Sequence, residues 1–252
     1  MTRAGENWVE EAIRSFTGGG RRRIARSAEL VVERGEGSFL HASGGRRFLD
    51  AVSGYGVASL GHSHPSWVEA VVAQAGRLAV APFDTKELAE YLRALADILP
   101  AHLGRVALFS GGAEAVEVAV RLAQTAGGRP GVLTFRESFH GKTAGVRYAG
   151  DPTGREGDAP GVDWMRTAPF PSCQTHDAIS YPSCTESADA SLSALTERKD
   201  LGDIGAVLLE PILGTAGNVP PERHFLKGLR RVCDEKGWLL ILDESITGIG
   251  RL

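Results

Sequence analysis

The feature that most restricts the fold is an alternation, through the second half of the sequence, of short apolar runs with segments of helical spacing. The apolar runs are residues 106–109, 132–135, 206–209 and 238–242. The helical segments are residues 113–126, 190–198 and 223–236. Short apolar strands separated by helices are typical of βαβ units, in which a parallel sheet is covered on both faces. The sequence therefore predicts an α/β fold with a mostly parallel sheet flanked by helices, and buried strands within it.

The N-terminal part has a different pattern. Residues 28–52 alternate polar and apolar side chains between turn signals, which predicts a small antiparallel sheet. A glycine-rich loop follows, and Pro65 then fits the first turn of a helix because its missing N–H would be unpaired there. Helical spacing predicts this helix over residues 66–78 and a second one over residues 85–99. Farther along, residues 150–189 are rich in Pro, Gly, Ser and Asp and predict long surface loops.

Composition argues against several classes of partner. The 252 residues carry 23% charged side chains, 42% apolar ones and a formal net charge of −3, without the excess that attracts nucleic acid or a membrane surface. Arg21-Arg22-Arg23 is too short for a nucleic-acid patch, and no apolar stretch is long enough to span a bilayer. Cys173, Cys184 and Cys233 form no close pair, so we expect reduced thiols and a cytoplasmic protein.

Acidic residues close two of the predicted strands. Glu210 follows the run 206–209, and Asp243 follows the run 238–242. Parallel sheets bind ligands beyond the carboxyl ends of their strands, and a carboxylate buried there must find a partner. An ion pair between Asp243 and a protonated ring nitrogen would be worth about 4 kcal/mol at an effective dielectric constant near 20. That is enough to keep a pyridine protonated at neutral pH, which a neutral Asn could not do.

Two further motifs lie at predicted strand ends. Ser110-Gly111-Gly112-Ala113-Glu114 precedes a helix, where the glycines and the helix N-terminus favour a cup of N–H groups for a phosphate or carboxylate. A plain strand-to-helix turn is an equal alternative, because the motif is neither a Walker loop nor G-x-G-x-x-G. Phe139-His140-Gly141 could stack on and polarise a flat ligand, although such a tripeptide also serves in loop packing.

His62 and His64 have a spacing that a metal site could use. They stand beside Pro65 with no cysteine or carboxylate near them in the sequence, which favours a structural turn. We therefore expect no metal.

Taken together and in order, these motifs resemble those of class III aminotransferases, which are pyridoxal 5′-phosphate (PLP) enzymes of fold type I. The resemblance runs from about residue 25 to residue 252. The matching stretches are Phe48-Leu49-Asp50, Gly61-His62-Ser63-His64-Pro65, Ser110-Gly111-Gly112-Ala113-Glu114-Ala115, Phe139-His140-Gly141-Lys142-Thr143, Glu210-Pro211-Ile212-Leu213-Gly214, Pro220-Pro221 with Phe225-Leu226-Lys227-Gly228-Leu229-Arg230, and Asp243 to Arg251. Several motifs in the right order are far more specific than any one alone.

The resemblance implies a PLP site. Its residues would be Ser110, Gly111, Gly112, Ala113, Phe139, His140, Glu210, Asp243, Ser245 and Ile246. The backbone at Gly112 and Ala113 would hold the cofactor phosphate. Phe139 would stack on one face of the pyridine ring, with His140 beside it.

The remaining roles concern the ring and the substrate. Asp243 would pair with the ring nitrogen, which keeps the ring an electron sink for the carbanion formed when the substrate loses its α-proton. Ser245 would lie against the opposite ring face, and Glu210 near the ring hydroxyl. Tyr55, in the glycine-rich loop, would line the substrate pocket.

The sequence departs from the family pattern at three points. Ser245 stands where relatives usually carry an aliphatic residue, most often Val. Thr215 replaces a glutamate found in many relatives that act on 4-aminobutyrate or ornithine, as in members that pair ω-amines with pyruvate. The third departure is that the lysine forming the Schiff base lies a few tens of residues beyond the Asp243 motif in relatives, outside this chain.

No other lysine is expected to take that role. The chain has Lys86, Lys142, Lys199, Lys227 and Lys236. Lys142 is nearest the ring-stacking motif, but the lysine at that place in relatives is not catalytic. We therefore expect an incomplete fold type I chain: residues 1–75 as the N-terminal segment of a small α+β domain, and residues 76–252 as a large PLP-binding domain incomplete at its C-terminus.

The activity implied is transfer of an amino group from an amine or amino acid to a 2-oxo acid, in a homodimer. Two alternatives remain open. One is a decarboxylase or aminomutase on the same scaffold, although Thr247-Gly248-Ile249-Gly250-Arg251 is more similar to the aminotransferases. The other is a non-catalytic subunit, or one that takes its lysine from a complementing C-terminal chain. The isolated chain is expected to show no transaminase turnover.

Overall fold

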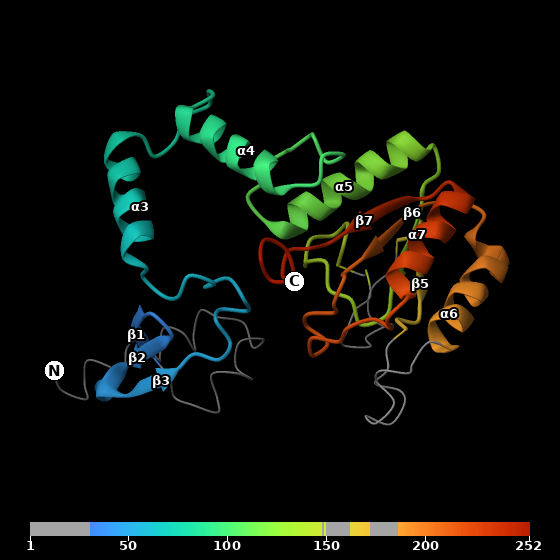
Figure 1. Ribbon diagram of the computed structural model, residues 1–252. Helices are drawn as coiled ribbons and strands as arrows, with labels where there is room; N and C mark the ends of the chain where they lie inside the picture. Colours follow the sequence, from blue (N-terminus) through green and yellow to red (C-terminus); the bar gives the residue numbers. More distant parts are fainter. Residues whose placement is uncertain (1–30, 148, 150–161, 172–185) are drawn as a thin grey trace. The chain divides into compact units, whose positions relative to one another are not determined.

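The computed structural model describes residues 31–147, 149, 162–171 and 186–252 (Figure 1). The chain divides into two compact units, the first ending at Gly104 and the second beginning at Arg105. The sequence placed a domain boundary after residue 75, and that boundary stays a prediction. The two units are described separately.

The first unit holds a small sheet and two helices. Its elements are β1 (Val32–Glu36), β2 (Phe39–Ala42), the 3-10 turn η2 (Ser43–Gly45), β3 (Arg47–Leu49), α3 (Pro65–Arg77) and α4 (Lys86–Ile98). The strands pair antiparallel in the order β1-β2-β3, as the alternating pattern predicted; residues 28–30 of that prediction lie outside the described residues. Both predicted helices are confirmed to within one residue, with Pro65 first in α3 and Thr85 capping α4 through the Leu88 N–H.

The second unit is an α/β layer structure. Its elements are α5 (Gly112–Gly127), β4 (Gly131–Phe135), β5 (Met165–Ala168), α6 (Glu186–Glu197), the 3-10 turn η5 (Lys199–Leu201), β6 (Ile204–Leu209), α7 (Phe225–Lys236) and β7 (Leu239–Leu242). The four strands are all parallel and lie in the order β5-β4-β6-β7. This confirms the predicted parallel sheet.

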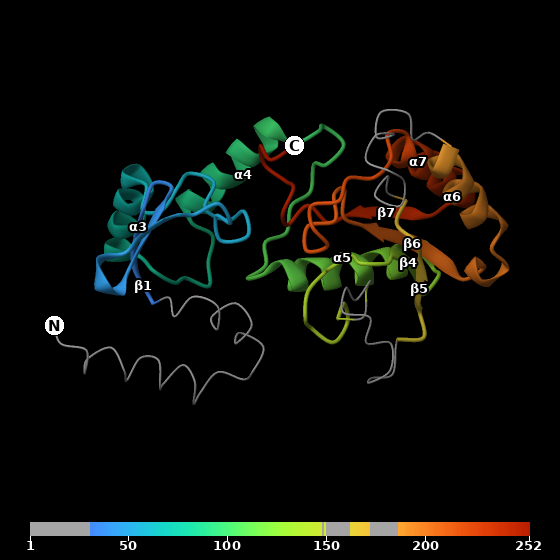
Figure 2. The same cartoon turned by 90° about the horizontal axis from the view of Figure 1, so that it is seen from below.

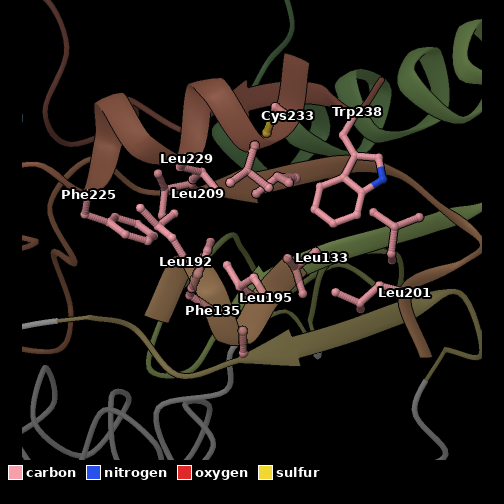
Figure 3. Close-up of a cluster of buried hydrophobic side chains, with 14 residues drawn as sticks. Leu133, Phe135, Leu192, Leu195, Leu201, Leu209, Phe225, Leu229, Cys233 and Trp238 are labelled. Carbon is pink, nitrogen blue, oxygen red and sulfur yellow. The ribbon is translucent and has the colours of Figure 1, made fainter. Parts of the chain in front are cut away.

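The strands carry apolar side chains on both faces of the sheet, and helices cover both faces. One cluster joins the sheet to α6 and α7, and Figure 3 shows its members Leu133, Phe135, Leu209, Leu192, Leu195, Phe225, Leu229 and Cys233. The other cluster joins Val132, Ala206 and Leu208 of the sheet to Val116, Val120 and Ala123 of α5. The view in Figure 2 shows α5 on one side of the sheet and α6 and α7 on the other.

Two side chains on the α6–α7 face have special surroundings. Phe135 makes edge-on contacts with Phe170 and Phe225, with ring centroids 6.1 and 5.6 Å apart. Cys233 is a free, fully buried thiol whose pKa burial raises to about 11. Cys173 and Cys184 lie outside the described residues. Across the described part of the chain, no helix combines the length and apolar character needed to cross a membrane.

Four sequence predictions about elements were wrong in detail. Residues 106–109 form no strand, because no described segment hydrogen-bonds to them, and Val106, Leu108 and Phe109 stay 40–52% exposed. Residues 165–168, predicted as loop, form β5 because they pair with β4. Helix α6 begins four residues before the predicted start at 190. Strand β7 is not buried, since β6 is the only strand of the described residues that pairs with it.

Candidate active site

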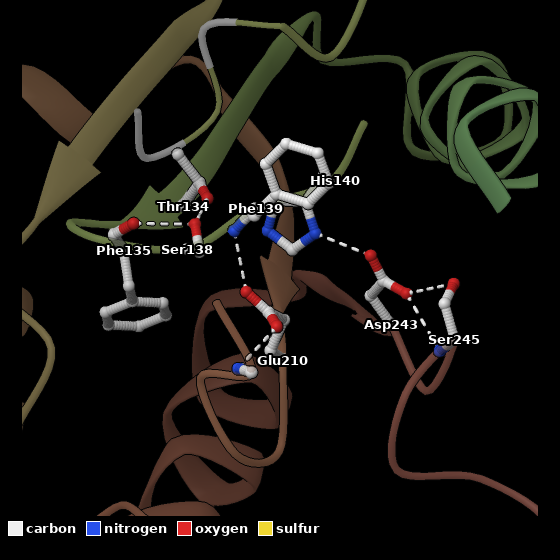
Figure 4. Close-up of polar contacts among 9 residues, drawn as sticks. Thr134, Phe135, Ser138, Phe139, His140, Glu210, Asp243 and Ser245 are labelled. Atoms are coloured by element: carbon white, nitrogen blue, oxygen red, sulfur yellow. Dashed lines mark hydrogen bonds and ion pairs between the residues drawn. The ribbon is translucent and has the colours of Figure 1, made fainter. Parts of the chain in front are cut away.

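The carboxyl ends of β4, β6 and β7 bring the predicted site residues together. Because the strands are parallel, the segments that follow Phe135, Leu209 and Leu242 leave the same edge of the sheet. The Asp243 N–H extends the ladder by donating to Leu209 O at 2.8 Å. The segments after these strands carry His140, Glu210 and Asp243, so residues far apart in the sequence meet at this edge (Figure 4).

Asp243 is a buried carboxylate with three donors. His140 Nδ1 donates to Oδ2 at 2.7 Å, and the Ser245 hydroxyl and N–H donate to Oδ1 at 2.7 and 3.1 Å. Burial works to raise the pKa of Asp243, but the hydrogen bonds from His140 and Ser245 outweigh it, so the pKa lies below its ordinary value of 3.8. The carboxylate is therefore held ionised.

Glu210 links two loops through their backbone. Its Oε1 accepts the Phe139 N–H at 2.6 Å, and its Oε2 accepts the Gly214 N–H at 3.0 Å. Burial raises the pKa of Glu210 above its ordinary 4.5, and these two hydrogen bonds offset only part of the rise. Both oxygens thus serve to fix the loops around the site.

The loop that carries Phe139 and His140 has a further anchor that sequence reasoning missed. Ser138 Oγ donates to Phe135 O at 2.7 Å and lies 3.2 Å from Thr134 Oγ1, with both side chains buried. Glu137 takes a positive φ of 67°, which turns the chain sharply after β4. In the sequence, the signal for this turn was Ser138, a hydroxyl residue placed three positions after the end of β4.

The N-terminus of α5 approaches this network. The first helical hydrogen bond runs from Ala115 N to Gly111 O at 3.1 Å, so the preceding amides have no acceptor within the helix. A Cβ on Gly112 would lie 2.9 Å from Ser245 Oγ, and a Cβ on Gly141 would collide with Ala113. The glycines therefore let α5, the loop after β4 and the loop after β7 approach closely.

Two more predicted or buried groups lie near this edge. Ile246 packs on the loop after β6, since a Cβ on Gly214 would lie 2.5 Å from Ile246 Cδ1. Among the described residues, His140 Nε2 and Thr247 Oγ1 are buried without a hydrogen-bond partner. Lys142, by contrast, is exposed.

These features fit an anionic, nitrogen-containing aromatic group. Free amides at a helix N-terminus favour a phosphate, and an ionised buried carboxylate favours a cationic ring nitrogen. Ser245 Oγ donates to Asp243 Oδ1 at 2.7 Å and would lie 2.9 Å from a Cβ on Gly112. The carboxylate and the first turn of α5 therefore lie on either side of the Ser245 hydroxyl.

Tyr55 lies in the first unit, which is described separately, so its predicted place in a substrate pocket stays a prediction. It is 67% exposed and takes a positive φ of 58°. Its loop is fastened by Asp50, whose Oδ2 accepts from His62 Nε2 at 2.7 Å and whose Oδ1 accepts the Val52 and Ser53 N–H groups. His62 thus has a structural contact, and His64 is exposed at the start of α3.

The family model described as aminotransferase class-III matches residues 22–252. The chain belongs to this family. Among curated relatives, the LysW-aminoadipate semialdehyde transaminase of Deinococcus radiodurans is 37% identical over 226 residues, covering 88% of this chain and 48% of the relative. The chain therefore spans about half the length of this relative.

Solved structures of transaminases agree with the fold. A thermostable (S)-enantioselective omega-transaminase from Thermomicrobium roseum matches with a TM-score of 0.85 and 27% identity, covering 100% of this chain and 59% of that one. An amine transaminase from an uncultivated Pseudomonas species, in its PLP-bound form, matches with a TM-score of 0.78 and 26% identity, covering 94% and 56%. The fold is that of fold type I transaminases, and the family's cofactor is PLP.

Proposed function

We propose that this chain carries the cofactor-binding part of a PLP-dependent aminotransferase, which moves an amino group from an amine or amino acid to a 2-oxo acid. The observation that carries the proposal is Asp243, a buried ionised carboxylate whose Ser245 neighbour also lies close to Gly112 in the first turn of α5. A carboxylate suits the protonated ring nitrogen of pyridoxal phosphate, and a nearby helix N-terminus suits its phosphate.

The residues divide the work as follows. Bound PLP supplies an electron sink for the substrate carbon that loses its proton. Asp243 holds a proton at the ring nitrogen, and the free amides at Gly112 and Ala113 bind the phosphate. Phe139 covers one ring face and Ser245 the other, with Ile246 beside it.

Further residues complete the proposed site. Glu210 fixes the Phe139 loop by accepting its N–H, so that the ring face is covered in a defined position. His140 orients the Asp243 carboxylate. Ser110 and Gly111 lead into α5 as part of the phosphate cup, and Tyr55 lines the substrate pocket.

The complete activity needs a lysine that forms a Schiff base with PLP, and we infer that none of the five lysines of this chain takes that role. We propose that it comes from a further segment, either as a continuation of the chain or as a complementing C-terminal chain, and that the active unit is a homodimer. The relatives' greater length supports this, since 48% of the Deinococcus enzyme is covered. Three cysteines without a close pair support a cytoplasmic location.

Cofactor binding tests the proposal without needing the lysine. Pyridoxamine 5′-phosphate should bind the 252-residue chain, and Asp243→Asn should weaken this binding about a hundredfold or more, because the charge partner of the ring nitrogen is lost. Binding is measured by the fluorescence of the ligand. Asp97→Asn, at an exposed site on α4, is the matched control and should bind as the unchanged chain does. Equal affinity of Asp243→Asn would sink the proposal.

Turnover is a separate measurement. With added PLP, the 252-residue chain alone should transfer no amino group from an amine to pyruvate, whereas the chain supplied with a lysine-bearing C-terminal segment should do so. Release of CO2 or migration of the amino group within the substrate would instead favour a decarboxylase or an aminomutase. Robust transfer by the isolated chain would contradict the assignment of the lysine to another segment.

A further inference from the structure

Ser245 makes a contact that an aliphatic side chain could not make. Its hydroxyl donates to Asp243 Oδ1 at 2.7 Å, beside its own N–H at 3.1 Å. The residue is exposed, so water could satisfy the hydroxyl if the carboxylate did not. Burial therefore does not force this hydrogen bond, and the hydroxyl still points at Asp243 in Figure 4.

The donors around Asp243 are distributed unevenly over its two oxygens. An ionised carboxylate has about four acceptor positions, two on each oxygen. Among the described residues, Oδ1 receives both Ser245 donors, whereas Oδ2 receives only His140 Nδ1. Oδ1 is thus filled, and the acceptor position that stays available lies on Oδ2.

Ser245 also lies close to the first turn of α5. Its Oγ would lie 2.9 Å from a Cβ on Gly112, in the first turn of α5. The hydroxyl therefore lies between the first turn of α5 and the carboxylate, and it is to the carboxylate that it hydrogen-bonds. From this place it can affect the orientation of the Asp243 carboxylate.

We propose that Ser245 is a positioning residue for cofactor binding: its hydroxyl occupies Asp243 Oδ1, and so directs Oδ2 toward the ring nitrogen of the cofactor. The inference rests on the proposed function, because it assigns Ser245 a role toward the same ligand. It adds that the serine at this position, where the family usually has Val, acts through Asp243 rather than only by covering the ring.

The titratable neighbours of Asp243 set the background for a test by pH. His140 faces it from the loop after β4, and Glu210 lies close enough after β6 to interact with it electrostatically. The Ser245 hydroxyl contributes to the lowered pKa of Asp243. Removing the hydroxyl should therefore let Asp243 protonate at a higher pH, with His140 and Glu210 unchanged.

The test compares variants by their binding of pyridoxamine 5′-phosphate to the 252-residue chain across pH. Ser245→Ala removes the hydroxyl, and Ser245→Val does so with the side chain usual in the family. Each should bind about tenfold more weakly at neutral pH, the effect of one hydrogen bond to a charged group. The acid-side loss of binding should move to higher pH. Ser245→Thr, which keeps a hydroxyl, should restore most of the affinity.

A double-mutant cycle separates positioning from ring contact. In an Asp243→Asn background, Ser245→Ala should have little further effect, because the residue through which it acts is gone. Ser193→Ala, at an exposed site on α6, controls for loss of a surface hydroxyl. Thermal unfolding confirms that each variant is folded. If Ser245→Ala does not fold, the ligand affinities of Ser245→Val and Ser245→Thr test the inference instead.

Two results would overturn the inference. One is unchanged affinity and pH dependence in both Ser245→Ala and Ser245→Val, and the other is an equal loss with and without the Asp243 carboxylate. If the unchanged chain does not bind the ligand, or binds it equally with Asn at position 243, the proposed function fails and this inference falls with it. If Asp243→Asn weakens binding but the Ser245 variants bind as the unchanged chain does, this inference fails and the proposed function stands.

Discussion

At the scale of single residues, the site is organised by carboxylates that have been taken out of water. Sequence reasoning predicted that Asp243 needs a partner, because an acid follows an apolar strand. It did not identify His140 Nδ1 as that partner, since the contact spans 103 positions in the chain and depends on strand order. Likewise, Glu210 was expected near a ligand, whereas its two oxygens hold the backbone of Phe139 and Gly214.

His140→Leu tests how much the pair with Asp243 stabilises the fold. The side chains of His140 and Asp243 are 0% and 5% exposed, so removing the histidine leaves a buried carboxylate short of a donor. We expect the free energy of unfolding at neutral pH to fall by about 3 kcal/mol. Urea denaturation measures this, and His102→Leu, at an exposed histidine, should change it by less than about 0.5 kcal/mol.

The pH dependence of the same variant has a definite sign. In the unchanged chain the pKa of Asp243 is lowered from 3.8, so its stabilising contribution is present above 3.8 and disappears as the pH falls through the lower folded value. Without His140 the folded pKa rises, and that acid-dependent part should shrink. An unfolding free energy with the same slope against pH in both proteins would contradict this account.

At the scale of elements, the apolar runs were a guide to burial but a poorer guide to strand pairing. Residues 132–135 and 206–209 became central strands because each has a neighbour on both sides. Residues 106–109 are as apolar but have no hydrogen-bonded neighbour among the described segments. Strand β5 carries Arg166 and Thr167, so its pairing with β4, and not its composition, defines it.

Helices were predicted more accurately because their signals are local. Periodicity and end residues lie within the helix itself, as in the Pro65 start of α3 and the left-handed Gly128 that ends α5. What the pattern does not contain is the partner of each helix. The packing of α6 on α7 depends on Gly228, where a Cβ would collide with Leu192 Cδ1.

Gly228→Ala tests that packing. Alanine favours a helix by about 1 kcal/mol over glycine, but here its Cβ must displace a buried leucine. We expect a net loss of about 1–2 kcal/mol of unfolding free energy from overpacking, measured by denaturant titration. Combining it with Leu192→Val should recover part of that loss, because the clashing methyl is removed. A more stable single variant would show that α6 moves aside freely.

At the scale of the whole molecule, the sheet of the second unit has an apolar edge. Among the strands that the structure describes, β7 pairs only with β6, and Leu239 and Leu242 are 42% and 46% exposed. Such an edge offers unpaired backbone groups flanked by hydrophobic side chains, a known route to association. The sequence predicted the strand but not its exposure, because burial depends on what lies beside it.

Leu239→Lys should reduce self-association of the 252-residue chain. A charge beside an exposed edge opposes strand-to-strand pairing between copies, while Leu240 and Ile241 keep the strand packed on both core clusters. Light scattering against protein concentration measures the effect. Leu122→Lys, on the exposed face of α5, adds the same charge away from the edge and should have less effect. Equal effects of the two changes would mean that net charge, not the edge, governs solubility.

The buried thiol of Cys233 can report when the core of the second unit opens to solvent. With a pKa of about 11, only roughly one such thiol in ten thousand is ionised at neutral pH, and alkylating reagents attack the ionised form. Its labelling by iodoacetamide therefore waits for α7 to lift from the sheet. Peptide mass mapping distinguishes Cys233 from Cys173 and Cys184, so the labelling rate at this one position measures how often the protein interior opens, without an engineered cysteine.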